Sequence, residues 1–211
     1  MNFTELSRSV RLATKRIEGW NSDHKADTLL AAVLWARPEN ILEVGVFGGK
    51  SLCVFGLALQ QLGRGHVLGI DSWSTAAVVA SHESTEEQQW WRGHGEAGVL
   101  DQRYAEAVQW IQRLGLGEYC SLRRCDAHEV AAEYAPQSFD VIHLDADKSH
   151  DGSLREIRSW LPKLRIGGLL VYDDCDWPTR RAAYMEARRT CRELYEHRAA
   201  GDAFAVLERE R

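Results

Sequence analysis

Acidic residues follow two apolar runs in the second half of the sequence. Asp145 ends the run Phe139 to Leu144, and Asp173 and Asp174 follow the run Leu169 to Tyr172. Such runs are typical of buried strands, and these two are expected to be neighbours in one α/β sheet. The three carboxylates would then meet at one edge of the sheet. There they must be protonated, paired with a base or bound to a cation.

A glycine-rich stretch, Ile41 to Ser51 with the sequence ILEVGVFGGKS, is the second candidate site. Its first residues are typical of a buried strand, and Gly45, Gly48 and Gly49 allow a backbone with positive φ. Ser51 can accept hydrogen bonds at the start of the helix that follows. A strand, a tight turn and a helix N-terminus form the cofactor crevice of an open α/β sheet.

Glycine spacing argues against two of the cofactor classes that use such a turn. A dinucleotide fingerprint needs glycines two and five residues after Gly45, where the sequence has Phe47 and Lys50. A phosphate-binding P-loop needs a glycine where the sequence has Val44. The remaining pattern has Glu43 two residues before the first glycine. It resembles the first motif of S-adenosylmethionine (SAM) methyltransferases, although plain strand-to-helix turns also contain it.

Two more acids follow predicted strands. The Asp71 carboxylate can accept hydrogen bonds from both hydroxyls of a ribose, although it would also serve as a helix cap. Ser72 and Trp73 come next, and the Trp73 ring would either cover an adenine base or join the core. In a methyltransferase Asp126, followed by Ala127, would accept from the adenine amino group. The alternative for Asp126 is the N-cap of a short helix.

Alternating strand and helix patterns predict a doubly wound, Rossmann-like α/β fold. We expect a seven-stranded, mostly parallel sheet with an antiparallel C-terminal hairpin strand. The length predicts a single domain over residues 1–211, with residues 1–39 as an N-terminal helical cap. The connection 72–100 is much longer than usual, which predicts a lid over the site, a surface excursion or a dimer contact.

The composition limits the binding partners and the cellular compartment that we expect for the protein. The net charge of −5 gives no support for a nucleic-acid backbone or an anionic membrane as partner. The five cysteines contain no C-x-x-C pair and the N-terminus lacks an apolar signal core, so we expect free thiols in the cytoplasm.

Over residues 25 to 208 these motifs resemble class I SAM-dependent methyltransferases. Within that class they are similar to the metal-dependent small-molecule O-methyltransferases, of catechol O-methyltransferase type and related antibiotic-tailoring enzymes. The resemblance implies that a divalent metal, expected to be Mg²⁺, binds Asp145, Asp173 and Asp174, and that the protein can form a homodimer. It implies that SAM contacts Glu43, Gly45, Gly48, Gly49, Ser51, Asp71, Ser72, Trp73, Asp126 and Ala127.

Asp174 is a departure from this pattern, because the catechol enzymes have asparagine there. Asp147 and His150 are a second departure, since the stretch DADKSH is closer to the pattern of the antibiotic-tailoring branch. The acceptor is therefore left open among sugars, catechol-like compounds and other natural products. The expected reaction is transfer of a methyl group to a hydroxyl of a small molecule, with the metal favouring the deprotonated hydroxyl and Lys148 or His150 taking the proton.

Other interpretations remain open. Lys148 would otherwise pair with the acids, and His150 would otherwise be an exposed loop residue. A metal-independent methyltransferase would use His150 or an aspartate as its base. A non-catalytic subunit that binds SAM is the third hypothesis.

Overall fold

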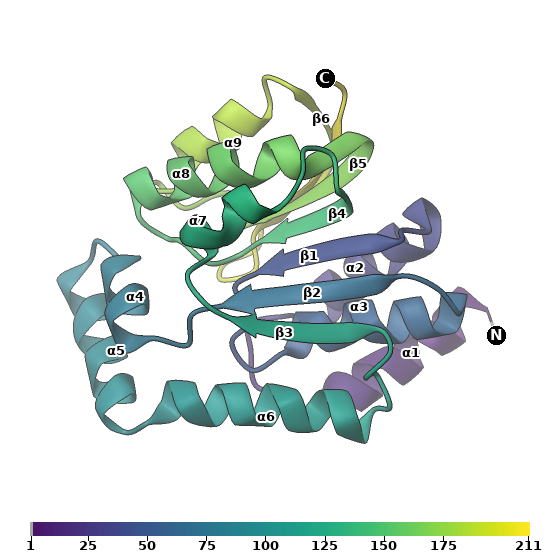
Figure 1. Ribbon diagram of the computed structural model, residues 1–211, viewed down its shortest axis with the longest axis horizontal. Helices are drawn as coiled ribbons and strands as arrows, with labels where there is room; N and C mark the ends of the chain where they lie inside the picture. The colour runs from purple at the N-terminus through teal and green to yellow at the C-terminus, as the bar shows by residue number, and fades with distance from the viewer. Residues whose placement is uncertain (1) are drawn as a thin grey trace.

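A seven-stranded sheet forms the centre of the protein in the computed structural model, which describes residues 2–211 (Figure 1). Met1, the first residue of the expected domain and helical cap, lies outside the described residues. The strand order is β3-β2-β1-β4-β5-β7-β6; β1 to β5 are parallel, and β7 is antiparallel to both of its neighbours. The predicted fold class is confirmed. The strands are β1 Asn40–Val44, β2 His66–Asp71, β3 Cys120–Arg124, β4 Phe139–Leu144, β5 Leu164–Asp173, β6 Cys191–His197 and β7 Phe204–Arg209.

Helices cover both faces of the sheet (Figure 1). Side chains alternate between the faces along each strand, so Ile41 joins one core cluster and Leu42 the other. The helices on one face are α1 Phe3–Thr14, α2 Asp23–Ala36, α3 Lys50–Leu62 and α6 Val99–Arg113. Those on the other face are α7 Ala127–Val130, α8 His150–Trp160 and α9 Arg181–Ala187.

Local sequence signals explain several boundaries. The helix α3 begins after Gly49 and ends at Gly63, both with positive φ, and α8 begins after Ser149, whose side chain accepts from the Gly152 amide. The strand β5 begins at Leu164 rather than at Leu169 as predicted, because backbone pairing with β4 already starts before the glycine pair.

The long connection 72–100 folds into two short helices, α4 Thr75–Ala80 and α5 Thr85–Glu96, before α6 begins. Both lie beyond the carboxyl ends of β1 to β4 (Figure 1). Two hydrogen bonds join this segment to the loop after β4. The Lys148 amide donates to the Ser81 carbonyl at 3.0 Å, and the His150 amide donates to the Glu83 carboxylate at 2.7 Å.

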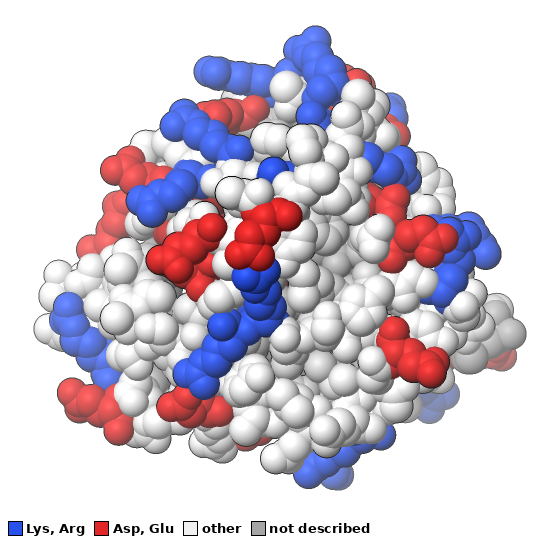
Figure 2. All heavy atoms as spheres, viewed as in Figure 1, with Lys and Arg blue, Asp and Glu red and all other residues white. Residues whose placement is uncertain are grey.

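Acidic and basic side chains are interspersed over the molecular face in Figure 2, and they form no single-sign stripe on that face. Within residues 2–211, none of the helices combines the length and the hydrophobicity needed to cross a membrane.

Candidate active site

A cavity of about 940 Å³ lies at the carboxyl edge of the parallel strands. Its wall combines the glycine turn, the ends of β2, β4 and β5, the helices α4 and α5, and the linker between α1 and α2. Most of the predicted site residues line it: Gly45, Ser51, Asp71, Ser72, Trp73, Asp126, Ala127, Asp145, Lys148, Asp173 and Asp174. The cavity lining does not include Glu43, Gly48, Gly49 or His150.

The Asp71 carboxylate orders the glycine turn. One oxygen accepts from the amides of Val46 and Phe47, both at 2.9 Å, and the other accepts from the Trp73 amide at 2.8 Å. Burial raises the pKa of Asp71, and the three N–H groups oppose that rise. Asp71 therefore fixes the backbone that connects β1 to α3, a role beyond the ribose contact expected from the sequence.

Close backbone contacts explain two of the three glycines. A Cβ on Gly45, at φ +92°, would lie 2.7 Å from the Asp145 carbonyl group, and one on Gly48 would lie 2.4 Å from the Glu18 carbonyl oxygen. Gly45 therefore lets the turn after β1 pass against the loop after β4. Gly48 lets the linker between α1 and α2 pack on the turn.

Glu43 lies behind the cavity wall. Its carboxylate accepts from the Ser51 hydroxyl and is 3.0 Å from the His143 Nδ1 atom, and both Glu43 and His143 are fully buried. Burial raises the pKa of Glu43, and the carboxylates of Asp173 and Glu43 raise the pKa of His143 against its own burial. The contact between Glu43 and His143 thus joins β1 to β4 behind the cavity wall.

Two lysines form ion pairs with the acids at the ends of β4 and β5. The Lys148 ammonium lies 2.5 Å from a carboxylate oxygen of Asp145 and 2.5 Å from one of Asp174. Lys25, carried by α2, is bonded to Asp173, and both of these side chains are only 4% exposed. The sequence placed the three aspartates correctly at adjacent strand ends, but it gave no sign of Lys25.

Mutual stabilisation shifts the protonation of these groups. Burial disfavours the lysine charges, yet the carboxylates outweigh it and raise the pKa of both Lys25 and Lys148. In the opposite sense, Lys25 and His143 lower the pKa of Asp173. Both lysines therefore carry their charge at neutral pH, and Lys148 is poorly suited to accept a proton.

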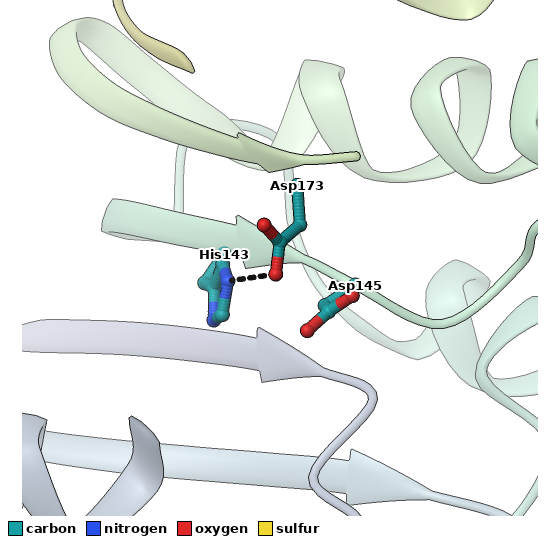
Figure 3. Close-up of side chains that lie close together, drawn as sticks. All are labelled: His143, Asp145 and Asp173. Carbon is teal, nitrogen blue, oxygen red and sulfur yellow. Dashed lines mark ion pairs between the residues drawn. The ribbon is translucent and has the colours of Figure 1, made fainter. Parts of the chain in front are cut away.

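His143 lies beside the acids but below the cavity surface. Its Nε2 atom is 3.7 Å from an Asp173 oxygen, an ion-pair distance, and makes no hydrogen bond (Figure 3). Among residues 2–211, the group of ligand-type atoms within 4.8 Å of one another comprises His143, Asp145 and Asp173. Asp174, which the resemblance implied as a metal ligand, is not a member of that group.

Aromatic side chains form another part of the cavity wall. The Trp20 ring lies 5.0 Å from Phe47, 6.4 Å from Trp90 and 6.2 Å from Trp91, measured between ring centroids. Trp20 and Trp90 remain 61% and 47% exposed, although both line the cavity. Exposed tryptophans within a cavity provide flat apolar surface for a ligand.

Asn21, next to Trp20, has unpaired polar atoms. The residue is 6% exposed and lines the cavity, and neither its amide nitrogen nor its amide oxygen has a hydrogen-bond partner within the protein. A buried amide of this kind favours a ligand that supplies both a donor and an acceptor. No local signal predicts this residue, because the α1–α2 linker contains no recognisable motif.

The remaining predicted site residues have different roles in the structure. Trp73 is 2% exposed, donates from Nε1 to the Phe47 carbonyl at 2.8 Å and still contributes to the cavity wall. The Asp126 side chain caps α7 by accepting from the His128 amide at 2.7 Å. His150 is exposed at the start of α8 and does not join the other candidate residues.

Comparison with known proteins gives a matching family model, a curated relative and similar solved structures. A family model described as a methyltransferase domain matches residues 42–175. Tricin synthase 1 from Oryza sativa subsp. japonica is 31% identical over 177 residues, which are 82% of this chain and 61% of that protein. The chain thus spans about 61% of the length of this curated relative.

Solved structures share the fold at low sequence identity. The O-methyltransferase from Bacillus cereus, in complex with S-adenosylhomocysteine (SAH), is 15% identical with a TM-score of 0.65, over 98% of this chain and 91% of that one. The O-methyltransferase TomG from Streptomyces achromogenes, involved in tomaymycin synthesis and in complex with SAM, is 15% identical with a TM-score of 0.66, over 98% and 90% of the two chains.

Proposed function

The chain belongs to the methyltransferase-domain family, and on that basis we propose that it transfers a methyl group from SAM to a hydroxyl group of a small molecule. One observation carries the proposal. A single cavity of about 940 Å³ connects the glycine turn after β1 with the acids and lysines at the ends of β4 and β5. It is large enough for a nucleoside cofactor and an acceptor together.

The cofactor half of the cavity is formed by the turn after β1 and the ends of β2 and β3. Gly45 and Ser51 come from the turn and the first residues of α3, and Asp71 and Asp126 follow β2 and β3. The unpaired amide of Asn21 fits an amino acid group, which offers both an ammonium donor and a carboxylate acceptor. Bound there, SAM supplies an electrophilic methyl group on a sulfonium.

The acceptor half must hold an oxygen and remove its proton. The Lys148 ammonium, fixed between Asp145 and Asp174, stabilises negative charge on the acceptor oxygen rather than acting as the base. Asp145 is the proposed proton acceptor, because it lines the cavity beside Lys148, and because burial and the neighbouring Asp173 raise its pKa. His150 has no place in this scheme, since it lies outside the cavity.

The divalent metal implied by the resemblance does not fit this arrangement. Carboxylate oxygens are suitable ligands for Mg²⁺, but here the ammonium groups of Lys25 and Lys148 are bonded to the three aspartates. In addition, the group of ligand-type atoms within 4.8 Å of one another contains His143, Asp145 and Asp173 but not Asp174. No step of the proposed reaction therefore involves a metal.

Aromatic residues support a ring-containing acceptor. Trp20, Trp90 and Trp91 would contact the faces of an aromatic or sugar ring, in keeping with the sugar, catechol-like and natural-product acceptors expected from the sequence. A plant relative named tricin synthase also supports a small-molecule acceptor. The net charge of −5 gives no support for nucleic acid as the partner.

An activity screen tests the proposal. The protein is incubated with SAM and a panel of hydroxylated phenols, sugars and polyketides, and SAH release and the mass of each acceptor are measured. We expect SAH release together with a methylated hydroxyl for at least one ring-containing acceptor. A protein that binds SAH tightly but methylates no member of the panel would support the non-catalytic hypothesis. Methylation of an amine or carbon alone would contradict O-methyl transfer.

A further inference from the structure

The acids at the ends of β4 and β5 already have cationic partners within the chain. Lys148 contacts Asp145 and Asp174 together, and Lys25 contacts Asp173. The two lysines come from different places, one from the loop after β4 and the other from the first turn of α2. This region of positive charge is therefore assembled by the fold, not by one local motif.

Burial strengthens the contact between Lys25 and Asp173. The Lys25 side chain is 4% exposed, as is the side chain of Asp173, so each charge has lost most of its hydration and depends on the other for stabilisation. Separating them to admit a metal ion would leave a buried ammonium group beside a divalent cation. The cost of that repulsion opposes metal binding.

Charge balance supports the same conclusion. Three carboxylates face two ammonium groups, so one negative charge remains uncompensated. A sulfonium cofactor with a zwitterionic amino acid group carries one net positive charge, which balances that excess. A divalent ion would instead leave the region with excess positive charge before the cofactor enters.

We propose that the ammonium group of Lys25 takes the place of a divalent ion at the ends of β4 and β5, so that methyl transfer by this chain needs no metal. Lys25 is a positioning residue: it holds Asp173 in place, and Asp173 in turn shapes the environment of Asp145. The inference rests on the proposed methyltransferase function, but metal binding can be measured without knowing the acceptor.

The test is a thermal-shift experiment on metal-stripped protein, with and without SAH and with Mg²⁺ or Mn²⁺ added at millimolar concentration. We expect SAH to raise the unfolding midpoint of the wild-type protein by several degrees, and the metals to add nothing to that shift. Calorimetric titration of the wild-type protein with Mg²⁺ and Mn²⁺ should give no saturable binding.

Lys25→Met removes the charge and keeps much of the side-chain length. This variant should gain a metal-dependent rise of the unfolding midpoint, because Asp173 is left without a cation. Lys25→Arg keeps the charge and should stay indifferent to metal. Lys15→Met is the matched control, since it removes an exposed lysine that does not line the cavity, and it should also stay indifferent.

Several outcomes would overturn the inference. Saturable Mg²⁺ or Mn²⁺ binding by the wild-type protein that is lost in Asp145→Asn contradicts it directly, and this arm needs no Lys25 variant to fold. A folded Lys25→Met protein that remains indifferent to metal contradicts the role given to Lys25. Absence of any SAH shift, in contrast, argues against the proposed function and not against the inference about metal.

Discussion

Lys25 in α2 and Asp173 at the end of β5 are 148 positions apart in the sequence, yet they form an ion pair in which both side chains are only 4% exposed. The pair joins the N-terminal helical region to the strand ends where chemistry is expected. Around it, His143 and Glu43 extend the buried polar contacts to Ser51 in the glycine turn. The cofactor turn and the acidic region are thus connected through the interior of the sheet.

Breaking this pair should destabilise the protein. Lys25→Met leaves the Asp173 carboxylate buried without its partner, and removing one member of a buried ion pair costs about 3–5 kcal/mol. Urea unfolding followed by circular dichroism measures the change in the free energy of unfolding. Lys15→Met, the exposed control, should change it by less than about 0.5 kcal/mol. Equal effects for the two variants would contradict a structural role for the buried pair.

Gly45→Ala should disrupt the turn after β1. The new Cβ would lie 2.7 Å from the Asp145 carbonyl group, and the residue would also be held at φ +92°. We expect a loss of at least about 3 kcal/mol in stability and loss of SAH binding. Gly63→Ala is the matched control, because Gly63 also has positive φ, +66°, but a Cβ there meets nothing within 4 Å. It should cost only about 1–2 kcal/mol and leave SAH binding intact.

The exposed tryptophans in the cavity wall should strengthen acceptor binding. Trp20→Ala and Trp90→Ala each remove one exposed ring from the cavity. Since a ring contact contributes about 0.5–1.5 kcal/mol, the acceptor KM should rise about two- to twelvefold with little change in kcat. Trp35→Ala is the control, because Trp35 is 63% exposed and does not line the cavity. An unchanged KM in both cavity variants would mean that the acceptor binds elsewhere.

The stability of the protein should depend on pH through the contact between His128 and Asp147. The Asp147 carboxylate accepts a hydrogen bond from His128 Nε2 at 3.3 Å, which is the main cause that raises the pKa of His128, and both side chains are mostly buried. A histidine whose folded pKa is raised stabilises the protein fully below its unfolded pKa of about 6.5, and this contribution is lost as pH rises through the folded pKa.

His128→Gln should therefore lower stability by about 1 kcal/mol at pH 6 and by clearly less at pH 9. Unfolding curves of both proteins at the two pH values measure the difference. A larger effect of the substitution at pH 9 than at pH 6 would contradict the assignment.

Much of the fold and part of the site could be predicted from the sequence, because the signals are local. Apolar runs that end in an acid give the strands and their carboxyl ends, and these correctly placed Asp71, Asp145 and Asp173 at one edge of the sheet. The glycine turn was recognisable from its spacing. The reason for Gly48, however, is contact with the Glu18 carbonyl, and nothing in the local sequence reveals it.

The partners of the acids could not be predicted in the same way. Lys25 lies in the first turn of an ordinary helix, and its contact with Asp173 exists only because α2 packs beside β5. His143 occupies a position inside a buried strand, where histidine gives no signal of what it faces. Long-range contacts of this kind determine whether the three aspartates bind a metal or lysines, and the motif alone implied the metal.

The measurement that tests the central claim most directly is calorimetric titration of metal-stripped protein with SAH, beside NAD as the comparison ligand and with Asp71→Ala as the variant. The account predicts one SAH bound per chain, no binding of NAD, and a Kd at least about tenfold weaker in Asp71→Ala, because that variant loses the carboxylate that holds the amides of Val46 and Phe47. Absence of SAH binding, or saturable binding of NAD in its place, would contradict it.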